Sequence, residues 1–135
     1  MASGKTQEAR GVTFTFDTGM LIALERRKRS AMIAFRAIIA RGHLPVVPAI
    51  VHVEWWRGRT DVREEILAAV VVEDMPRTLC RAAGEALAHV RGATIADAIV
   101  MASAALRGGG VVYTSDLEDL RRLQHHFPTV AVLPA

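Results

Sequence analysis

Short runs of apolar, β-branched and aromatic residues alternate with helical segments along the whole chain, and this alternation most constrains the fold. The runs cover residues 12–16, 44–47, 70–72, 111–114 and 129–133, and none contains a charged residue. Composition of this kind favours β-strands. Strands that are apolar throughout are typical of parallel sheets whose two faces are both covered by helices. The sequence therefore predicts a three-layer α/β/α domain with about five parallel strands.

The segments between these runs carry helix start and stop signals. Prolines at 48 and 76 and a threonine at 94 mark helix starts, and glycines at 42, 58, 92 and 108–110 follow helix ends. We expect both prolines at first helical positions, where the missing N–H is not needed. The predicted helices cover residues 20–29, 30–40, 48–57, 60–69, 76–90, 94–106 and 117–126.

The length of 135 residues fits one domain. We expect residues 1–11 to form a flexible N-terminal lead and residues 12–135 to form the domain. The start is polar and lacks the apolar core of a secretory signal, and no uncharged apolar run is long enough to cross a membrane. The single cysteine, Cys80, is expected as a buried or half-buried reduced thiol. These features predict a cytoplasmic protein.

Four carboxylates are each the only charged group in an apolar stretch: Asp17, Glu54, Asp97 and Asp116. Asp17 and Asp116 lie at the carboxyl ends of predicted strands, and ligands of such sheets bind beyond these ends. Taken singly, each acid has an ordinary alternative. Asp17 and Asp116 are suited to capping helices, Asp97 lies in a capping-box-like start, and Glu54 has arginines nearby for a surface ion pair.

Taken together, the acids favour a cation site. Two carboxylates about 4 Å apart repel each other by about 4 kcal/mol at an effective dielectric constant of 20. A group of such acids therefore needs a cation to stay ionised. Oxygen ligands without His or Cys favour Mg²⁺ or Mn²⁺ over zinc. Such a site suits phosphodiester hydrolysis, in which one ion lowers the pKa of the attacking water and a second can stabilise the leaving oxygen.

These residues also carry a family resemblance that extends from about Val12 to Leu133. The four segments are FTFDT (14–18), EWWRG (54–58), TIADA (94–98) and VYTSD (112–116), the last followed by LEDL (117–120). In this order and spacing, the chain resembles the PIN-domain nucleases, and in particular the VapC toxins of bacterial type II toxin–antitoxin pairs.

The resemblance implies a parallel sheet in the order 3-2-1-4-5 and an acidic pocket that holds Mg²⁺ or Mn²⁺. It implies an endoribonuclease that cuts single-stranded or looped RNA to leave a 5′-phosphate and a 3′-hydroxyl. It also implies a homodimer and a VapB-type antitoxin whose tail blocks the pocket. Carried over by position, the metal-site acids are Asp17, Glu54, Asp97 and Asp116, the accessory acid is Asp119, and the supporting hydroxyls are Thr18 and Thr114. Position 19, where the family often has Ser or Asn, is glycine here.

Two further features have both an ordinary and a functional interpretation. The basic run Arg26-Arg27-Lys28-Arg29 is either a solvated helix end or a contact for RNA or a protein partner. Of the adjacent Trp55 and Trp56, we expect one in the core and the other available to the antitoxin or the second subunit.

Other function classes remain beside the toxin. One is a PIN-domain nuclease that processes RNA without being a toxin, and another is a catalytically silent PIN-like binding module. A phosphatase or receiver-type domain is disfavoured, because no second acid lies near Asp17 and no lysine follows Lys28.

Overall fold

A five-stranded parallel sheet forms the centre of the protein. The structure is a computed structural model that describes residues 12–135, so the predicted N-terminal lead lies outside the described residues. The strands are β1 (Phe14–Phe16), β2 (Val46–Pro48), β3 (Val71–Glu73), β4 (Gly110–Thr114) and β5 (Val130–Pro134). They pair in the order β3-β2-β1-β4-β5, all parallel, which confirms the predicted order 3-2-1-4-5.

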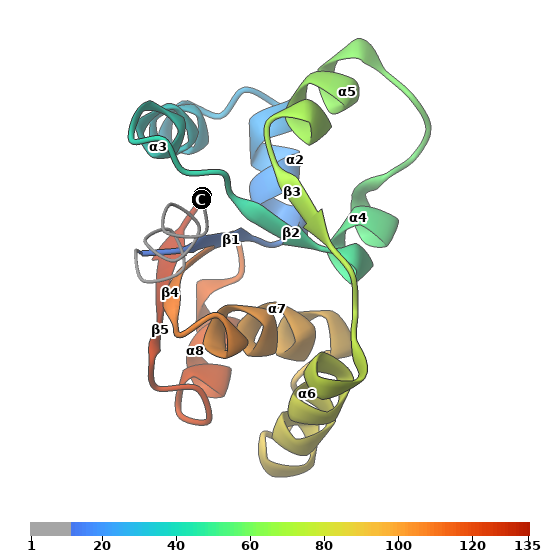
Figure 1. Ribbon diagram of the computed structural model, residues 1–135, viewed down its shortest axis with the longest axis vertical. Coiled ribbons are helices and arrows are strands. Elements are labelled where there is room, and N and C mark those ends of the chain that lie inside the picture. Colours follow the sequence, from blue (N-terminus) through green and yellow to red (C-terminus); the bar gives the residue numbers. More distant parts are fainter. Residues whose placement is uncertain (1–11) are drawn as a thin grey trace, which may run out of the picture.

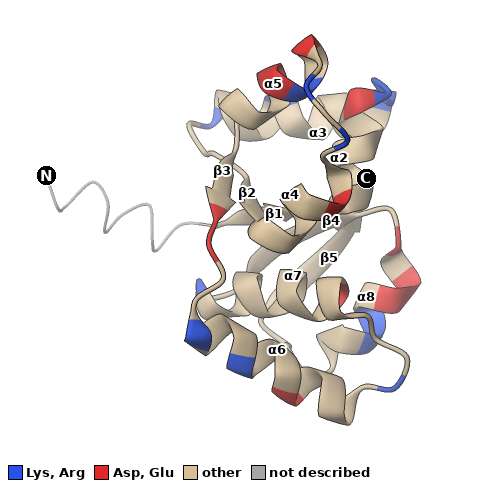
Figure 2. Ribbon diagram, turned by 90° about the vertical axis from the view of Figure 1, so that its right-hand side faces the viewer, with Lys and Arg blue, Asp and Glu red and all other residues tan. Residues whose placement is uncertain are grey.

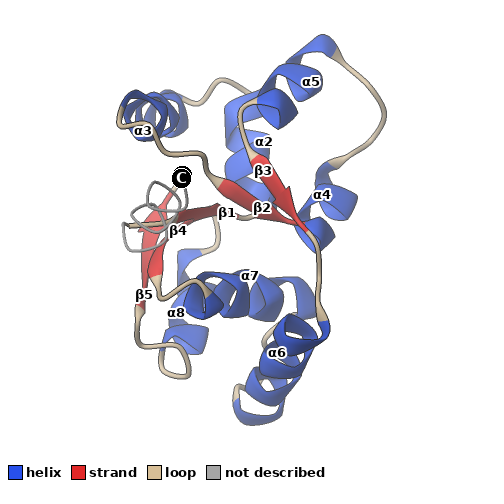
Figure 3. Cartoon of the chain, viewed as in Figure 1, coloured by secondary structure: helices blue, strands red, loops and turns tan. Residues whose placement is uncertain are grey.

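Helices cover the sheet on both sides, which confirms the three-layer architecture (Figure 1). The helices are α2 (Thr18–Glu25), α3 (Arg29–Ala40), α4 (Ala49–Trp55), α5 (Asp61–Ala68), α6 (Arg77–His89), α7 (Ile95–Leu106) and α8 (Leu117–Gln124). Figure 3 shows α2, α3 and α5 on one side and α6, α7 and α8 on the other. No helix within residues 12–135 is long and apolar enough to cross a membrane.

Burial follows the position of each strand in the sheet. All three residues of the central strand β1 are buried, as expected for a strand covered on both faces. Strand β3, predicted from the apolar run 70–72, is different, because its Val71 and Val72 are 44% and 39% exposed. The apolar run therefore predicts the strand correctly but not its burial, since β3 is an edge strand that only partly enters the core.

The two prolines occupy the N-cap position of their helices, one position before the first helical position that was predicted. Pro48 ends β2 and caps α4, and Pro76 caps α6, with extended ψ angles of 147° and 164° rather than helical ones. The proline ring fixes φ but leaves ψ open, so the same residue fits the cap as well as the first helical position.

Exposure varies along the covering helices, and it corrects one expectation, the burial of Cys80. Helix α7 is buried from Ala98 to Ala104, but its end residues Ile95 and Leu106 are 63% and 55% exposed. Cys80 is exposed rather than buried or half-buried. The buried face of α6 contains Leu79, Ala83 and Ala86, and the residue after Leu79 is turned about 100° away from that face.

The chain reverses its direction across the sheet between β1 and β4. From β1 the chain proceeds to β2 and β3 on one side, and it then returns to β4 and β5 on the other. Strands β1 and β4 are paired, with Phe16 opposite Tyr113, so the residues that follow these two strands lie side by side. Open α/β sheets bind ligands at this kind of position.

A polar network fastens the end of α7 to the sheet. The Arg107 guanidinium donates to Glu73 Oε2 (2.8 Å), to Ser103 Oγ (2.7 Å) and to the Thr15 hydroxyl. The Ser103 hydroxyl donates to Glu73 Oε1 at 2.5 Å. The Arg107 and Glu73 side chains are only 19% and 30% exposed, so the network links α7, β1 and β3 through a shielded ion pair.

Removing one partner of this ion pair should destabilise the fold. We expect Glu73→Gln to lower the free energy of unfolding by about 2–3 kcal/mol, because it leaves a shielded guanidinium without its counter-charge. The double variant Glu73→Gln/Arg107→Met should lose less than the sum of the two single losses. Urea denaturation of the four proteins measures this coupling, and strictly additive losses would contradict it.

Candidate metal centre

One pocket at the carboxyl edge of the sheet contains side chains of all four predicted acids. It has a volume of about 250 Å³ and is lined by residues of α2, α4, α7 and the β4–α8 connection. The acids that line it are Asp17, Glu54, Asp97 and Asp116. The structure thus brings together four residues that lie as many as 99 positions apart in the sequence, from 17 to 116. Figure 2 looks onto this side of the molecule, with acidic residues at the start of α8 and basic residues between α5 and α2.

Asp17 is the buried member of this group, with 6% exposure. Its Oδ1 accepts a hydrogen bond from the Met20 amide (2.8 Å), which caps α2, and its Oδ2 accepts one from the Thr114 hydroxyl. The Thr114 oxygen in turn accepts from the Asp116 amide at 2.8 Å. The helix cap and the pocket position, which were alternatives in the sequence, are therefore found in the same residue.

Glu54 lies at the exposed mouth of the pocket. Its Oε1 accepts a hydrogen bond from the Thr18 hydroxyl (2.6 Å), which connects α4 to the first residue of α2. The alternative surface ion pair of Glu54 is not found within residues 12–135: Arg59 pairs with Asp61 and Glu64 instead.

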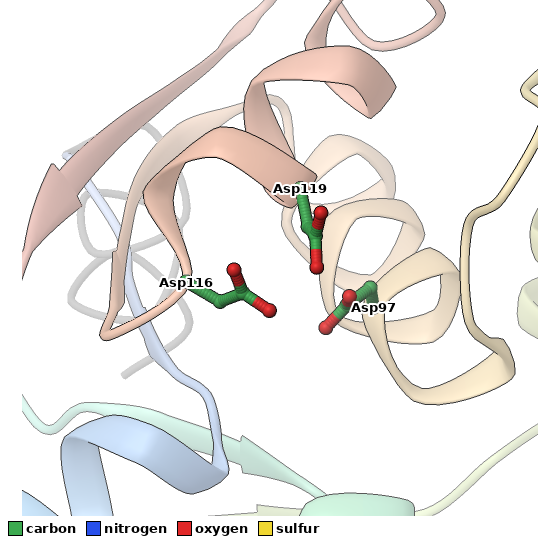
Figure 4. A group of neighbouring side chains, drawn as sticks. All are labelled: Asp97, Asp116 and Asp119. Carbon is green, nitrogen blue, oxygen red and sulfur yellow. The ribbon is translucent and has the colours of Figure 1, made fainter.

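The other acids form a tighter trio with Asp119. Asp97, Asp116 and Asp119 each offer a carboxylate oxygen, and these oxygens lie within 4.8 Å of one another. Figure 4 shows the three carboxylates directed into the same space from α7, the loop before α8, and α8. Asp116 is at the N-cap position of α8 but makes no capping bond, so its carboxylate is directed to the trio. Thr94 fills the capping role for α7 by accepting from the Asp97 amide at 3.1 Å.

Burial and crowding raise the pKa values of three of these acids, Asp17, Asp97 and Asp116. Burial raises the pKa of Asp17 from 3.8 to about 6, with Asp97 and Asp116 adding repulsion. Burial also raises the pKa of Asp97. A side-chain hydrogen bond to Asp119 raises the pKa of Asp116, and the same bond, together with Arg122, lowers the pKa of Asp119.

The donor set fits a hard divalent cation. Every ionisable group in the pocket wall is a carboxylate, and neither histidine nor cysteine lines it. Carboxylate and water oxygens are the ligands that Mg²⁺ and Mn²⁺ prefer. A cation bound there would favour the ionised form of these acids and would compete with protons for the same oxygens.

Sequence reasoning missed a role for Ser115, which lines the pocket beside Gly19. A Cβ atom at Gly19 would lie 1.8 Å from Ser115 Oγ and 2.6 Å from Ser115 Cβ. Ser115 therefore occupies the space that a side chain at position 19 would need. Glycine fits at this position because it has no side chain. No local pattern reveals this, because the two residues meet only through the pairing of β1 with β4.

The tryptophans and the basic run also receive definite places. Trp55 is buried (3% exposed) and donates its indole N–H to Glu25 at 3.0 Å, while Trp56 is half-buried, so one tryptophan enters the core as expected. Arg26 and Arg29 are exposed, and Arg27 adopts a left-handed backbone with φ 57° at the turn between α2 and α3.

Comparison with known proteins identifies the family. A family model of the PIN domain matches residues 14–125, and the chain therefore belongs to the PIN-domain family. Members of this family are nucleases, hydrolases that act on phosphodiester bonds, and they use divalent metals. No curated protein sequence was found to match the chain.

Solved structures share the fold at low sequence identity. VapBC2 from Rickettsia felis bound to a promoter DNA fragment has a TM-score of 0.73 at 11% identity, covering 92% of this chain and 99% of that one. DNA-bound VapBC from Salmonella typhimurium has a TM-score of 0.67 at 17% identity, with coverages of 92% and 98%. A toxin–antitoxin complex from Klebsiella pneumoniae has a TM-score of 0.67 at 18% identity, with coverages of 88% and 96%.

The acid pKa values predict a pH-dependent stability that a cation reverses. Asp17 binds its proton more tightly when folded, so the metal-free protein should lose stability as pH rises from about 4 through about 6. Its shift from 3.8 to about 6 corresponds to about 3 kcal/mol. Asp17→Asn should remove most of this loss. Thermal unfolding in EDTA across this pH range measures it.

Added Mg²⁺ or Mn²⁺ should raise the melting temperature more at about pH 7.5 than at about pH 5, because protons compete with the cation for the same oxygens. Glu118→Gln, an exposed neighbour of Asp119 outside the trio, serves as the matched control and should respond like the unmodified protein. An equal effect of the cation at both pH values would contradict this explanation.

Proposed function

We propose that this protein is the VapC-type toxin of a type II toxin–antitoxin pair, a Mg²⁺- or Mn²⁺-dependent endoribonuclease. One observation carries the proposal: the carboxylates of Asp97, Asp116 and Asp119 converge beside Asp17 and Glu54 at the carboxyl edge of a PIN-domain sheet. We assign the catalytic and metal-binding work to Asp17, Glu54, Asp97 and Asp116, with Asp119 as accessory acid and with Thr18 and Thr114 as supporting hydroxyls.

Each residue has a distinct part in this proposal. Asp97, Asp116 and Asp119 would hold the cation through their facing oxygens, and Asp17 would fix the base of the site through its bond to Thr114. Glu54, oriented by Thr18 at the pocket mouth, is suited to orient an attacking water or accept its proton. When bound, Mg²⁺ or Mn²⁺ would lower the pKa of that water and neutralise charge on the phosphate.

The assembly state and the partner belong to the same proposal. The similar structures from Rickettsia felis and Salmonella typhimurium are VapBC complexes, and the one from Klebsiella pneumoniae is a toxin–antitoxin complex. By analogy with these complexes, we propose that this protein has a VapB-type antitoxin as its partner. The antitoxin would neutralise the protein by covering its acidic pocket. We also propose that the protein is a homodimer and acts on RNA in the cytoplasm.

Cleavage of RNA tests the enzymatic part. The purified protein should cut single-stranded RNA with Mg²⁺ or Mn²⁺ and be inactive in EDTA. Asp97→Asn should lower the rate about 100-fold or more, because the site would lose several kcal/mol of charge stabilisation. Glu118→Gln, an acid outside the trio, should keep full activity. Full activity of Asp97→Asn would overturn the site assignment.

The two alternatives predict other results in the same assay. A catalytically silent binding module would bind Mn²⁺ in calorimetry and leave RNA intact. A non-toxin RNA-processing nuclease would cut RNA but would leave bacterial growth unaffected when it is expressed.

Induced expression in a bacterium tests the toxin role. Expression of the unmodified protein or of Glu118→Gln should arrest growth, whereas Asp97→Asn should leave growth unchanged at equal protein level. Optical density and colony counts measure the effect. Unaffected growth with an active nuclease would argue against the toxin and for RNA processing.

A further inference from the structure

A second groove opens beside the acidic pocket and shares Glu54 with it. This groove has a volume of about 410 Å³, larger than the acidic pocket, and lies between α2, α4 and the start of α5. Its polar lining consists of Glu25, Arg26, Glu54, Arg57 and Arg63, and we name it the arginine groove. Because Glu54 lines both cavities, the arginine groove adjoins the acidic pocket at this residue.

One ion pair forms a neutral wall of the arginine groove. Arg63 binds Glu25 Oε2 at 2.9 Å and also donates to the Gly58 carbonyl at 2.9 Å. The other oxygen of Glu25 accepts the indole N–H of the buried Trp55 at 3.0 Å. Both charges of this pair are thus satisfied within the fold, so neither contributes a net charge to the groove.

Arg26 and Arg57 supply the surplus positive charge. Both side chains belong to exposed residues, and neither has a carboxylate within 4 Å among residues 12–135. Within residues 12–135, the only polar contact of Arg57 is a long hydrogen bond of 3.5 Å to the adjacent Trp56 carbonyl. Glu54 also lines the groove, so the three arginines and two glutamates of the lining leave one net positive charge. Guanidinium groups bind phosphate oxygens through paired N–H donors, so two such groups that form no ion pair within residues 12–135 suit a polyanionic strand.

The fold divides the basic run 26–29 between different surfaces. After Arg26 the chain turns through the left-handed residue Arg27, whose side chain lines a separate cavity with Met32, Phe35 and Glu65. Lys28 is tied to the backbone oxygen of Ala135 at 3.0 Å. Of this run, only Arg26 lines the groove, and Arg57, which is remote in sequence, joins it there.

We infer that the arginine groove binds the backbone phosphates of single-stranded RNA next to the phosphate that is cut. This inference rests on the proposed function. The acidic pocket repels a polyanion in the absence of its cation, so attraction for the strand has to come from groups outside it. Arg26 and Arg57 line the cavity that adjoins the pocket at Glu54. The only aromatic side chain in the lining, Trp55, is buried, so the groove holds backbone rather than stacked bases and is indifferent to base sequence.

The test measures RNA binding without cleavage. A fluorescently labelled single-stranded RNA is titrated, at several salt concentrations and with Mg²⁺, into Asp97→Asn protein and into the same protein with Arg26→Gln and Arg57→Gln. Each arginine substitution should weaken binding and lower the slope of log Kd against log salt by about 0.7, the value for one phosphate contact on a single strand. The matched controls Arg27→Gln and Arg29→Gln should leave the slope unchanged.

In the cleaving protein, Arg26→Gln/Arg57→Gln should raise KM with little change in kcat. Circular dichroism and thermal unfolding check that the exposed substitutions leave the fold intact.

The outcomes separate this inference from the proposed function. If the parent protein binds and cuts RNA but the arginine variants behave like it, the inference is wrong and the proposed function stands. If the variants lose antitoxin binding and keep RNA binding, the groove belongs to the protein partner and the inference is also wrong. If the unmodified protein cuts no RNA, the proposed function fails and takes the inference with it.

Discussion

A single buried carboxylate connects the elements that meet at the carboxyl edge of the central strands. Asp17 follows β1, caps α2 through the Met20 amide, and reaches the end of β4 through the Thr114 hydroxyl, which itself receives the Asp116 amide. Two strands and the starts of two helices therefore meet on one side chain. The same burial raises the pKa of this acid to about 6. The side chain that connects the elements at the carboxyl edge of the sheet is therefore also one whose ionised form is disfavoured by burial.

The gathering of a buried acid with other acids makes the carboxyl edge of the sheet suitable for cation-dependent chemistry. The in-register pairing of β1 with β4 places acids of two strands side by side at the reversal point, and α7 adds Asp97 from the covering layer. A fold selected only for stability would place apolar groups there. The trio with Asp119 concentrates negative charge on one side of Glu54, and the arginine groove lies on the other side of the same residue.

The sheet order is predicted from the family resemblance, whereas the convergence of the acids follows from local signals and topology. Asp17 directly follows β1, Asp116 lies two residues after the end of β4, and a parallel sheet leaves such strand ends at one edge. Features that depend on packing are not predictable in this way. Cys80 is exposed because α6 turns it off the buried face, and Arg57 joins the arginine groove because α4 packs beside α2. Apolar composition locates β3 but cannot show that it is an exposed edge.

The placement of the tryptophans gives the protein an optical property. The chain contains two tryptophans, and both follow Glu54 directly in sequence. Trp55 is buried with its indole N–H bonded to Glu25 in the groove wall, and its ring lies 6.2 Å from that of Trp56, centroid to centroid. All intrinsic tryptophan emission therefore originates within a few residues of the pocket mouth. A cation, an oligonucleotide or a protein that settles there would shift the colour or yield of that emission, with no dye attached.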